Sequence, residues 1–314
     1  MEIGLVVDAA CDLPPAFLAE RGVEVLPIGI RLGERQLQDV RDPERTAAFY
    51  RERLDRRTEL HAQSHPLDPA AVEATLLERW ATRYDHLVCM TITSARSPIY
   101  AHATRAALTV GTRAREKRRA EGLPLRWGAT VINSRSMFAG QAVLAWEAVR
   151  LREAGAALGE LELRLRALAE RIHTYLVADD LYFVLHRAAR KGDRSVNWAS
   201  YALGNLLDVK PILHCHRDTT GPVAKVRGFE AGVRRVFDNV LAEAGRGLEV
   251  PCVCVSYAGA LDRLEQMPGF AAFRAELEAA GHTVLVSQMS KTGAVNVGVG
   301  SLCVAFAAAQ HRFS

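Results

Sequence analysis

Two serines follow a short apolar run and are candidates for binding an anion. The run from Leu87 to Met90 is typical of a buried β-strand, and a polar loop with Ser94 and Ser97 separates it from a helical pattern that starts at Ile99. Ser97 is expected at the helix N-cap, with a proline at the first helical position. Such a loop directs free backbone N–H groups and the positive end of the helix dipole at one point. The sequence therefore predicts a site for a phosphate or a carboxylate.

Polar side chains also follow other apolar runs, at the points where strands are expected to end. They are Asp8 and Asp12 near the start of the chain, Gln63 and Ser64 before a helical stretch, and Asn133 and Ser134 after residues 130–132. The carboxyl ends of parallel strands meet at one edge of a sheet, and ligands of open α/β proteins bind there. We therefore expect these loops to converge with the loop that holds Ser94 and Ser97.

The elements that would position these loops alternate between strands and helices over residues 1–155. The run from Ile3 to Val7, a short helix and a second strand from Val23 to Ile30 form a strand–helix–strand unit, which is typical of a parallel sheet. Residues 60–66 are expected to form a loop, and helices are expected over residues 69–80 and from Ile99 onward. The prediction for residues 1–155 is an α/β domain with three layers around a parallel sheet.

The pattern changes after Gly155. An amphipathic helix over residues 158–172 precedes a strand from Thr174 to Val177, which is expected at the edge of a second sheet. Later segments include a helix over residues 229–244 and a last strand over residues 302–306. We expect residues 156–314 to form a two-layer α/β domain with a mixed sheet, and the ligand site to lie between the two domains.

Length and composition exclude several classes of protein. The 314 residues favour two domains, and a composition of 49% hydrophobic and 24% charged residues is ordinary for a globular protein. The net charge of +4 does not by itself indicate nucleic-acid binding, and no apolar run reaches the roughly 18 to 20 residues of a membrane span. The first apolar run is cut by Asp8 and lacks a preceding basic segment, so it predicts a strand and not a signal peptide. Without an export signal, the six cysteines are expected to be reduced and the protein cytoplasmic.

The loops, taken in order, resemble the motifs of the DegV family, the bacterial fatty-acid-binding proteins. The first loop, Val7 to Pro14, is similar to the family's TDSTADLP, and Thr93 to Ala103 is similar to SSGLSGTYQSA. Further matches in chain order are Gln63 to Pro66 with TSQPSP, Val131 to Ser134 with VIDS, Val184 to Arg190 with YLKKGGR, and Leu206 to Leu213 with a segment that ends in KPIL. Together they cover nearly the whole chain.

The resemblance implies that a long-chain fatty acid lies between the two domains, with its tail in an apolar tunnel and its carboxylate where the loops converge. In some members a partner fatty acid kinase receives that carboxylate and phosphorylates it. The side chains that the resemblance places at the carboxylate are Ser97, Ser64, Gln63, Ser94, Arg190 and Asn296, and those that support the loops are Asp8, Asp12 and Ser134. The expected protein is a lipid carrier and not an enzyme, with no metal ion or other cofactor.

Several positions depart from the family motifs, among them Ala188 and Ala189, which stand in place of the glycines before the arginine at position 190. Ala9 stands in place of the serine of the first loop, and Gln63 in place of the threonine of TSQPSP. Asn296 stands in place of the histidine of the closing HxGPGA motif. We expect the site to keep its capacity to hold an anion but to lack a proton donor at the position of that histidine.

The alternative function is an enzyme that acts on an anionic small molecule in the crevice between the domains. It would need an acid or base with a perturbed pKa near Ser97, and the candidates are Asp8, Asp12 and His65. Ser97 itself is a poor candidate for a hydrolase nucleophile, because no G-x-S-x-G elbow surrounds it.

Other polar groups have simpler explanations. Arg190 belongs to a basic cluster and could lie on a solvated face instead of at the carboxylate. His214 and His216, which share one face of a strand, lack the usual spacing of zinc ligands. The basic run over residues 113–119 has no interleaved aromatic residues for stacking on bases, so it predicts a solvated helix end.

Overall fold

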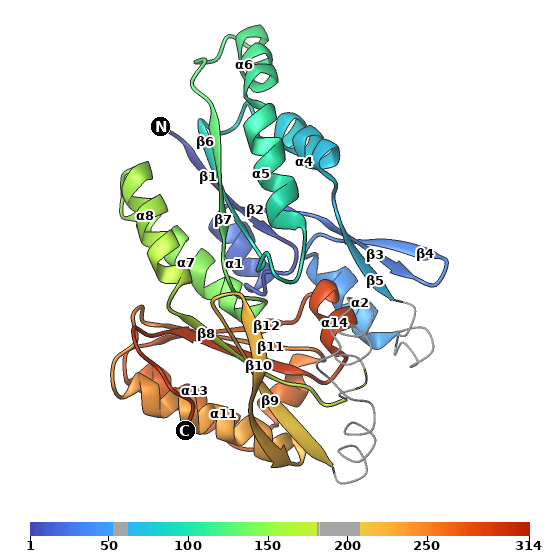
Figure 1. The fold of residues 1–314 in the computed structure, drawn as a ribbon, viewed down its shortest axis with the longest axis vertical. Helices are drawn as coiled ribbons and strands as arrows, with labels where there is room; N and C mark the ends of the chain where they lie inside the picture. The colour runs from blue at the N-terminus through green and yellow to red at the C-terminus, as the bar shows by residue number, and fades with distance from the viewer. Residues whose placement is uncertain (53–61, 181, 183–207) are drawn as a thin grey trace.

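The computed structural model describes residues 1–52, 62–180, 182 and 208–314 (Figure 1). These residues form a parallel sheet (sheet A), a mixed sheet (sheet C) and a small antiparallel sheet (sheet B). The predicted α/β fold class, with one parallel and one mixed sheet, is confirmed. No helix within these ranges is long and apolar enough to cross a membrane, and all six cysteines are free and buried.

Sheet A has the strand order β2-β1-β6-β7, and all neighbouring strands run parallel. The strands are β1 (Ile3–Asp8), β2 (Val23–Leu26), β6 (His86–Thr91) and β7 (Gly128–Asn133). The helices of this part are α1 (Pro15–Glu20), α2 (Pro43–Arg51), α4 (Pro69–Thr75), the π-helix η1 (Leu76–Trp80), α5 (Ile99–Thr109), α6 (Gly111–Ala120), α7 (Ala139–Glu153) and α8 (Leu158–Ala169). Helices α4 and α5 lie on one side of the sheet, and α7 and α8 lie on the other (Figure 1).

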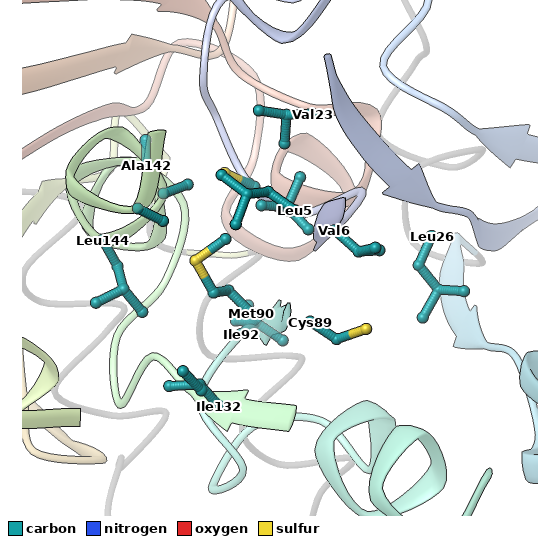
Figure 2. Packing of buried hydrophobic residues seen from close by; sticks show 14 of the residues in the cluster. Leu5, Val6, Val23, Leu26, Cys89, Met90, Ile92, Ile132, Ala142 and Leu144 are labelled. Atoms are coloured by element: carbon teal, nitrogen blue, oxygen red, sulfur yellow. The ribbon is translucent and has the colours of Figure 1, made fainter. Parts of the chain in front are cut away.

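The core between sheet A and α7 explains the apolar runs in the sequence. Every residue of β1 is buried, as expected for a strand that is covered on both faces. Figure 2 shows Leu5, Met90 and Ile132 of three neighbouring strands gathered with Ala142 and Leu144 of α7. None of these five side chains is more than 1% exposed.

Sheet C has the strand order β10-β9-β8-β13-β11-β12, and only β11 and β12 run parallel. Its strands are β8 (Ile172–Val177), β9 (Val209–His216), β10 (Thr219–Arg227), β11 (Cys252–Tyr257), β12 (Thr283–Gln288) and β13 (Leu302–Ala307). The helices of this part are α11 (Phe229–Ala244), α12 (Leu261–Glu265), α13 (Phe270–Ala279) and α14 (Lys291–Val297). The helix predicted over residues 229–244 is confirmed.

Helix α7 joins the two large sheets. It contacts β1 and β6 of sheet A and also β8, β11 and β13 of sheet C. Ten of its fifteen residues are buried, and most of these are small. Small side chains allow two sheets to approach one helix closely. Because α7 packs on both sheets, the domain boundary at residue 155 stays a prediction.

The prediction that residues 174–177 form an edge strand is wrong. Strand β8 lies between β9 and β13, and all of its residues are buried. The polar side chains of this strand are paired internally. The Thr174 and Ser136 hydroxyls are 2.6 Å apart, and His173 Nδ1 lies 3.1 Å from His214 Nε2.

Sheet B was not predicted. It consists of β3 (Ile28–Leu32), β4 (Arg35–Asp39) and β5 (Gln63–Pro66), in the order β4-β3-β5. The predicted strand from Val23 to Ile30 is therefore two strands in different sheets, divided at Pro27, which has no N–H to continue a ladder. Residues 63–66, predicted as a loop, pair with β3 and contact α14.

The prediction of a solvated helix end over residues 113–119 is wrong for Arg118, which is 3% exposed. Arg118 Nη1 donates to the carbonyl oxygens of Ala81 and Tyr84, at 2.9 and 2.8 Å. Its Nη2 donates to Asp85 at 2.6 Å. These carbonyls follow η1, so the arginine satisfies backbone acceptors that a helix end leaves without partners.

Replacing Arg118 with glutamine is expected to destabilise the fold by about 2 kcal/mol, because buried carbonyl oxygens lose their donors. Urea denaturation monitored by circular dichroism measures this loss. The matched control is Arg119→Gln, which changes the next residue on the exposed side of α6 and should stay within about 0.5 kcal/mol of wild type. Equal effects of the two substitutions would contradict the capping role.

Candidate functional site

The loops that follow β1 and β6 are joined by a buried carboxylate. Asp8, at the end of β1, is 1% exposed. Its two oxygens accept hydrogen bonds from the amides of Ala10, at 2.9 Å, and of Ile92, at 2.7 Å. Asp8 therefore holds the start of one polar loop against the start of the next.

Hydrogen bonds also connect the loop after β6 to the loop after β7. The Thr93 amide donates to the Ser136 carbonyl at 2.8 Å, and the Ser134 hydroxyl donates to the same carbonyl at 3.0 Å. The three polar loops at the carboxyl ends of β1, β6 and β7 thus lie together, as expected for a parallel sheet.

Ser97 lies just before α5, in the loop formed by residues 94–97, which we call the head-group loop. The N-cap position is Pro98 and the helix begins at Ile99, so the predicted cap is displaced by one residue. Ser97 Oγ nevertheless accepts a hydrogen bond from the Ile99 amide at 3.3 Å. Hydrogen bonds between a serine hydroxyl and a backbone amide two residues later are common where a helix starts.

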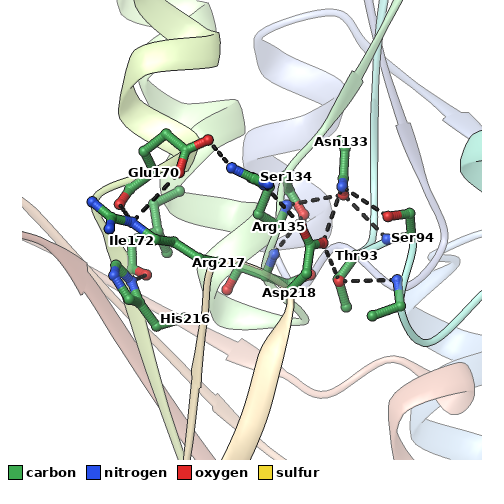
Figure 3. A network of polar contacts seen from close by, with 12 residues as sticks. Thr93, Ser94, Asn133, Ser134, Arg135, Glu170, Ile172, His216, Arg217 and Asp218 are labelled. Atoms are coloured by element: carbon green, nitrogen blue, oxygen red, sulfur yellow. Dashed lines mark hydrogen bonds and ion pairs between the residues drawn. The ribbon is translucent and has the colours of Figure 1, made fainter.

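Ser94 is exposed and belongs to a polar network that links the head-group loop to a hairpin of sheet C (Figure 3). Its hydroxyl accepts a hydrogen bond from Asn133 Nδ2 at 3.0 Å, and its amide donates to Asn133 Oδ1 at 3.2 Å. The same Nδ2 donates to Asp218 at 3.0 Å.

The structure brings Ser64 and Asn296 together across 232 positions of the chain. Asn296 Nδ2 donates to Ser64 Oγ at 3.2 Å and to the Thr292 carbonyl at 2.7 Å. The side chain of Gln63, the neighbouring residue in β5, instead accepts from Arg31 Nη2 at 2.7 Å, because adjacent residues of a strand point to opposite faces. Arg190 lies outside the described residues.

Helix α5 ties the region of Ser64 to the region of Ser97. Strand β5 leads into the segment that contains Leu67, whose carbonyl lies 2.7 Å from Nδ1 of His102. His102 is in the first turns of α5, directly after the head-group loop. The two groups of predicted ligands therefore flank the same end of α5.

Asp12 holds the first loop against sheet C. Its Oδ1 accepts from the Ser290 amide at 2.8 Å and lies 3.4 Å from Nη1 of Arg41. The Arg41 guanidinium, also buried, donates from Nη2 to the Leu13 carbonyl and to Ser287 Oγ, each at 2.9 Å. Sequence reasoning missed Arg41, because the single arginine lies in a polar stretch with no periodic pattern.

Burial raises the pKa of both loop carboxylates, Asp8 and Asp12. It raises the pKa of Asp8 to about 6, although the amides of Ile92 and Ala10 oppose this shift. Burial also raises the pKa of Asp12, against the opposing charge of Arg41. Asp8 is thus an acid with a raised pKa beside the polar loops, but both of its oxygens accept hydrogen bonds from backbone amides.

Two hollows are lined by described residues, and both lie in the part of the chain that carries sheet C. One, of about 750 Å³, lies at the start of α11 and is lined by residues that include Asp179, Arg227, Tyr257 and Arg263. The other, of about 630 Å³, lies against the C-terminal residues 310–314. Neither contains a predicted head-group residue, so the apolar tunnel stays a prediction.

A family model described as "Uncharacterised protein, DegV family" matches residues 2–309. The chain belongs to the DegV family. A DegV domain-containing protein of Xanthomonas campestris pv. campestris is 42% identical over 314 residues and covers 100% of both chains.

Two solved structures have the DegV fold seen in this chain. A DegV family protein from Thermus thermophilus, described by its fatty-acid binding, has a TM-score of 0.72 and 21% identity, and covers 98% of this chain and 100% of that one. A stearic-acid-binding protein from Eubacterium ventriosum has a TM-score of 0.73 and 20% identity, and covers 97% of this chain and 98% of that one. At these identities the likeness establishes the fold.

The departures from the DegV motifs fall at definite places in this fold. Ala9 is fully buried and has no hydroxyl to offer a ligand. Gln63 is engaged with Arg31, whereas Asn296 contacts Ser64 directly. The amide of Asn296, which the resemblance matches to the motif histidine, thus contacts a predicted ligand.

Three residues of the polar network were not among the predicted site residues, namely Thr93, Arg135 and Asp218. Arg217 and Asp218 form a two-residue turn between β9 and β10, but the pair lacks the Asn-Gly or Asp-Gly signal that marks such a turn in a sequence. Local sequence therefore predicts neither the turn nor the loops that it contacts.

Proposed function

We propose that this protein binds a long-chain fatty acid, with the carboxylate at the polar loops between sheets A and C and the acyl tail in an apolar tunnel. The proposal is supported by membership of the DegV family over residues 2–309 and by the fold shared with proteins described as binding fatty acids. Removing the tail from water would supply most of the affinity, at roughly 0.8 kcal/mol for each buried CH₂.

The geometric observation that carries the head-group assignment is common to the three candidate serines. Each hydroxyl oxygen accepts a hydrogen bond from a protein N–H group: Ser64 from Asn296, Ser94 from Asn133, and Ser97 from the Ile99 amide. A hydroxyl has one hydrogen to donate in addition to its acceptor sites. An accepting serine therefore keeps its O–H group for an acceptor such as a carboxylate.

The proposed head-group set is Ser97, Ser64, Ser94, Gln63, Asn296 and Arg190, with Asp8, Asp12 and Ser134 as loop supports. The hydroxyl groups and the Gln63 amide are neutral donors, which select an ionised carboxylate through charge-assisted hydrogen bonds. Asn296 donates both hydrogens of Nδ2 to Ser64 and Thr292, so its role would be to position Ser64. Arg190 would add a charge to the set.

Native mass spectrometry of freshly purified protein tests the binding function. We expect a co-purified species whose mass matches a long-chain fatty acid, and saturable binding when such an acid is added to delipidated protein. The absence of both would refute the proposal and favour the enzymatic alternative, for which Asp8 is the described acid with the most suitable pKa.

Replacing Ser97 with alanine is expected to weaken fatty-acid binding by about tenfold or more, because hydrogen bonds to charged groups contribute about 1.5 to 3 kcal/mol. Titration of a fluorescent fatty acid measures the dissociation constant. Thr112→Ala, on the exposed side of α6, is the matched loss of a hydroxyl. Unchanged affinity in Ser97→Ala would show that the head group lies elsewhere, even if the protein binds fatty acid.

We further propose a role as a carrier that presents the bound acid to a fatty acid kinase. In that role the carboxylate must be reachable from outside while the tail stays buried. The exposure of Ser94 and the partial exposure of Ser97 support this arrangement. Formation of an acyl phosphate by a bacterial fatty acid kinase, with this protein as the source of the acid, is the test.

A further inference from the structure

The hairpin formed by β9 and β10 reaches from sheet C to the polar loops of sheet A (Figure 3). Its tip consists of Arg217 and Asp218, which lie between the two strands. The Asp218 amide donates to the Arg135 carbonyl at 3.1 Å, so backbone as well as side chains make the contact.

The Asp218 carboxylate lies in a cradle of three donors at the carboxyl ends of β6 and β7. Thr93 Oγ1 donates to it at 2.6 Å, Asn133 Nδ2 at 3.0 Å and Arg135 Nε at 2.8 Å. Although partial burial opposes the effect, hydrogen bonds from these three residues hold the pKa of Asp218 below its ordinary value. The tip therefore carries a negative charge that the cradle binds.

The backbone at this contact is strained on both sides. Arg135, Arg217 and Asp218 have φ angles of 54°, 50° and 66°, in the left-handed region. They are half of the six non-glycine residues with positive φ among the described residues. A two-residue hairpin turn of this kind favours Asn-Gly. Left-handed backbone costs an arginine about 1 to 2 kcal/mol, whereas aspartate and asparagine adopt it more readily. Strain of this size is retained where a particular side chain is needed.

The cradle is continuous with the head-group loop. Thr93 Oγ1, which donates to Asp218, also accepts from the Ala95 amide at 3.3 Å. Asn133, the second donor, holds both the hydroxyl and the amide of Ser94. The position of Asp218 therefore influences the loop that presents Ser94 and Ser97.

The contact between the hairpin tip and the polar loops is partly exposed to solvent. The side chains of Asp218 and Arg135 are 21% and 36% exposed. Glu170, which pairs with Arg135 and Arg217, is 40% exposed. Partly exposed ion pairs contribute little and are screened by salt. In the described part of the chain, strand β10 is also the last strand of sheet C, so moving the tip breaks no ladder on its outer side within that part.

We propose that the β9–β10 hairpin is a gate over the fatty-acid head group, and that Asp218 holds it closed by binding to Thr93, Asn133 and Arg135. This inference rests on the proposed function and adds a regulation of that same site. Opening of the hairpin sets the rates at which the acid enters and leaves, while the affinity depends on the tunnel and the serines.

Stopped-flow fluorescence with cis-parinaric acid, a fluorescent long-chain fatty acid, tests the gate. In Asp218→Asn the charge is lost, but asparagine tolerates the left-handed backbone of the turn. We expect the association and dissociation rates both to rise about tenfold, with a change in affinity of less than about twofold. In wild type the dissociation rate should increase with ionic strength, and in Asp218→Asn this dependence should be weaker.

Asp238→Asn, which makes the same chemical change at an exposed position of α11, should keep wild-type rates. Thr93→Val is a second variant that removes a donor from the other side of the contact, and it should reproduce the faster rates. Hydrogen exchange of residues 216–219 in the ligand-free protein should be faster in both gate variants than in wild type.

The possible results of these experiments distinguish a failure of the gate from a failure of the proposed fatty-acid binding. Fatty-acid binding by wild type with unchanged rates in Asp218→Asn and Thr93→Val would overturn the gate alone. A large loss of affinity at unchanged association rate would also overturn it, since Asp218 would then support bound ligand and not access. If wild type binds no cis-parinaric acid or other long-chain fatty acid, the proposed function fails and the gate fails with it.

Discussion

Replacing Gly140 with alanine is expected to destabilise the protein by about 3 kcal/mol, the upper part of the range for overpacked cores. A Cβ atom at this position would lie 2.0 Å from Ser136 Oγ and 2.1 Å from Thr174 Oγ1. These two hydroxyls are hydrogen-bonded to each other and buried. The added methyl group would therefore have to break their bond and push α7 away from β8.

The control for this substitution is Gly159→Ala in α8. No atom lies within 4 Å of a Cβ built there, so alanine should stabilise the helix by about 0.5 to 1 kcal/mol. Urea denaturation of both variants measures the difference. A loss below about 0.5 kcal/mol in Gly140→Ala would show that the junction between the sheets is loosely packed.

Gly140 also shows what the sequence does and does not reveal. The apolar run of β1 and the periodicity of α11 follow directly from burial, and both elements were predicted from them. The same reasoning predicts a helix after Ser134, but a glycine in a helix signals only a local cost. Gly140 is required because Ser136 and Thr174 meet beside it. Ser136 follows β7 of sheet A and Thr174 lies in β8 of sheet C, so local sequence does not show this contact.

The candidate site depends on long-range contacts in the same way. Ser97 and Ser94 could be proposed from a strand, a polar loop and a helix start, all local features. Asn296 was named only through the family resemblance, because nothing near it indicates a contact with Ser64. No periodic pattern in the sequence indicates the contacts of the Asp218 carboxylate, because hairpin turns are polar whether or not they contact another loop.

The misassigned elements have a related cause. Residues 63–66 contain Gln63, Ser64 and His65, which favour a loop by composition, yet they pair with β3 to form an edge strand. Strand β8, whose segment from Thr174 to Val177 was expected at a sheet edge, carries the polar residues His173 and Thr174. Both residues are paired inside the protein, and local sequence cannot distinguish a paired polar side chain from a solvated one.

Acid is expected to destabilise the protein through the histidines of sheet C. The ring of His173 stacks on His216 at 4.1 Å and on His214 at 5.2 Å between centroids, and His311 packs edge-on at 4.9 Å. Burial, then the nearby histidines His216, His311 and His214, lower the pKa of His173 to about 2. Burial, then His216 and His311, lower the pKa of His214 to about 4.

The direction of the effect follows from proton binding. Well above pH 6.5, His173 and His214 are neutral in both the folded and the unfolded chain, so they contribute no pH dependence there. Below pH 6.5 the unfolded chain takes up protons at His173 and the folded chain does not. At pH 4.5 this difference costs about 2.7 kcal/mol for His173 alone, two pKa units at about 1.36 kcal/mol each. Asp8, whose pKa is raised to about 6 by burial, acts in the opposite direction, because its folded form binds a proton first.

His173→Phe separates the contribution of His173 to the pH dependence from that of Asp8. Phenylalanine keeps a flat ring in the stack but cannot be protonated. The variant loses the contact with His214, so a constant loss of stability at pH 7.5 is expected. Relative to that value, the free energy of unfolding should fall by about 2 to 3 kcal/mol less than in wild type between pH 7.5 and pH 4.5. Urea denaturation across this range measures the difference, and His65→Phe, at an exposed position of β5, controls for removing a histidine as such. Parallel pH profiles for wild type and His173→Phe would mean that the folded protein accommodates a charged His173, and that the stacked histidines do not resist protonation.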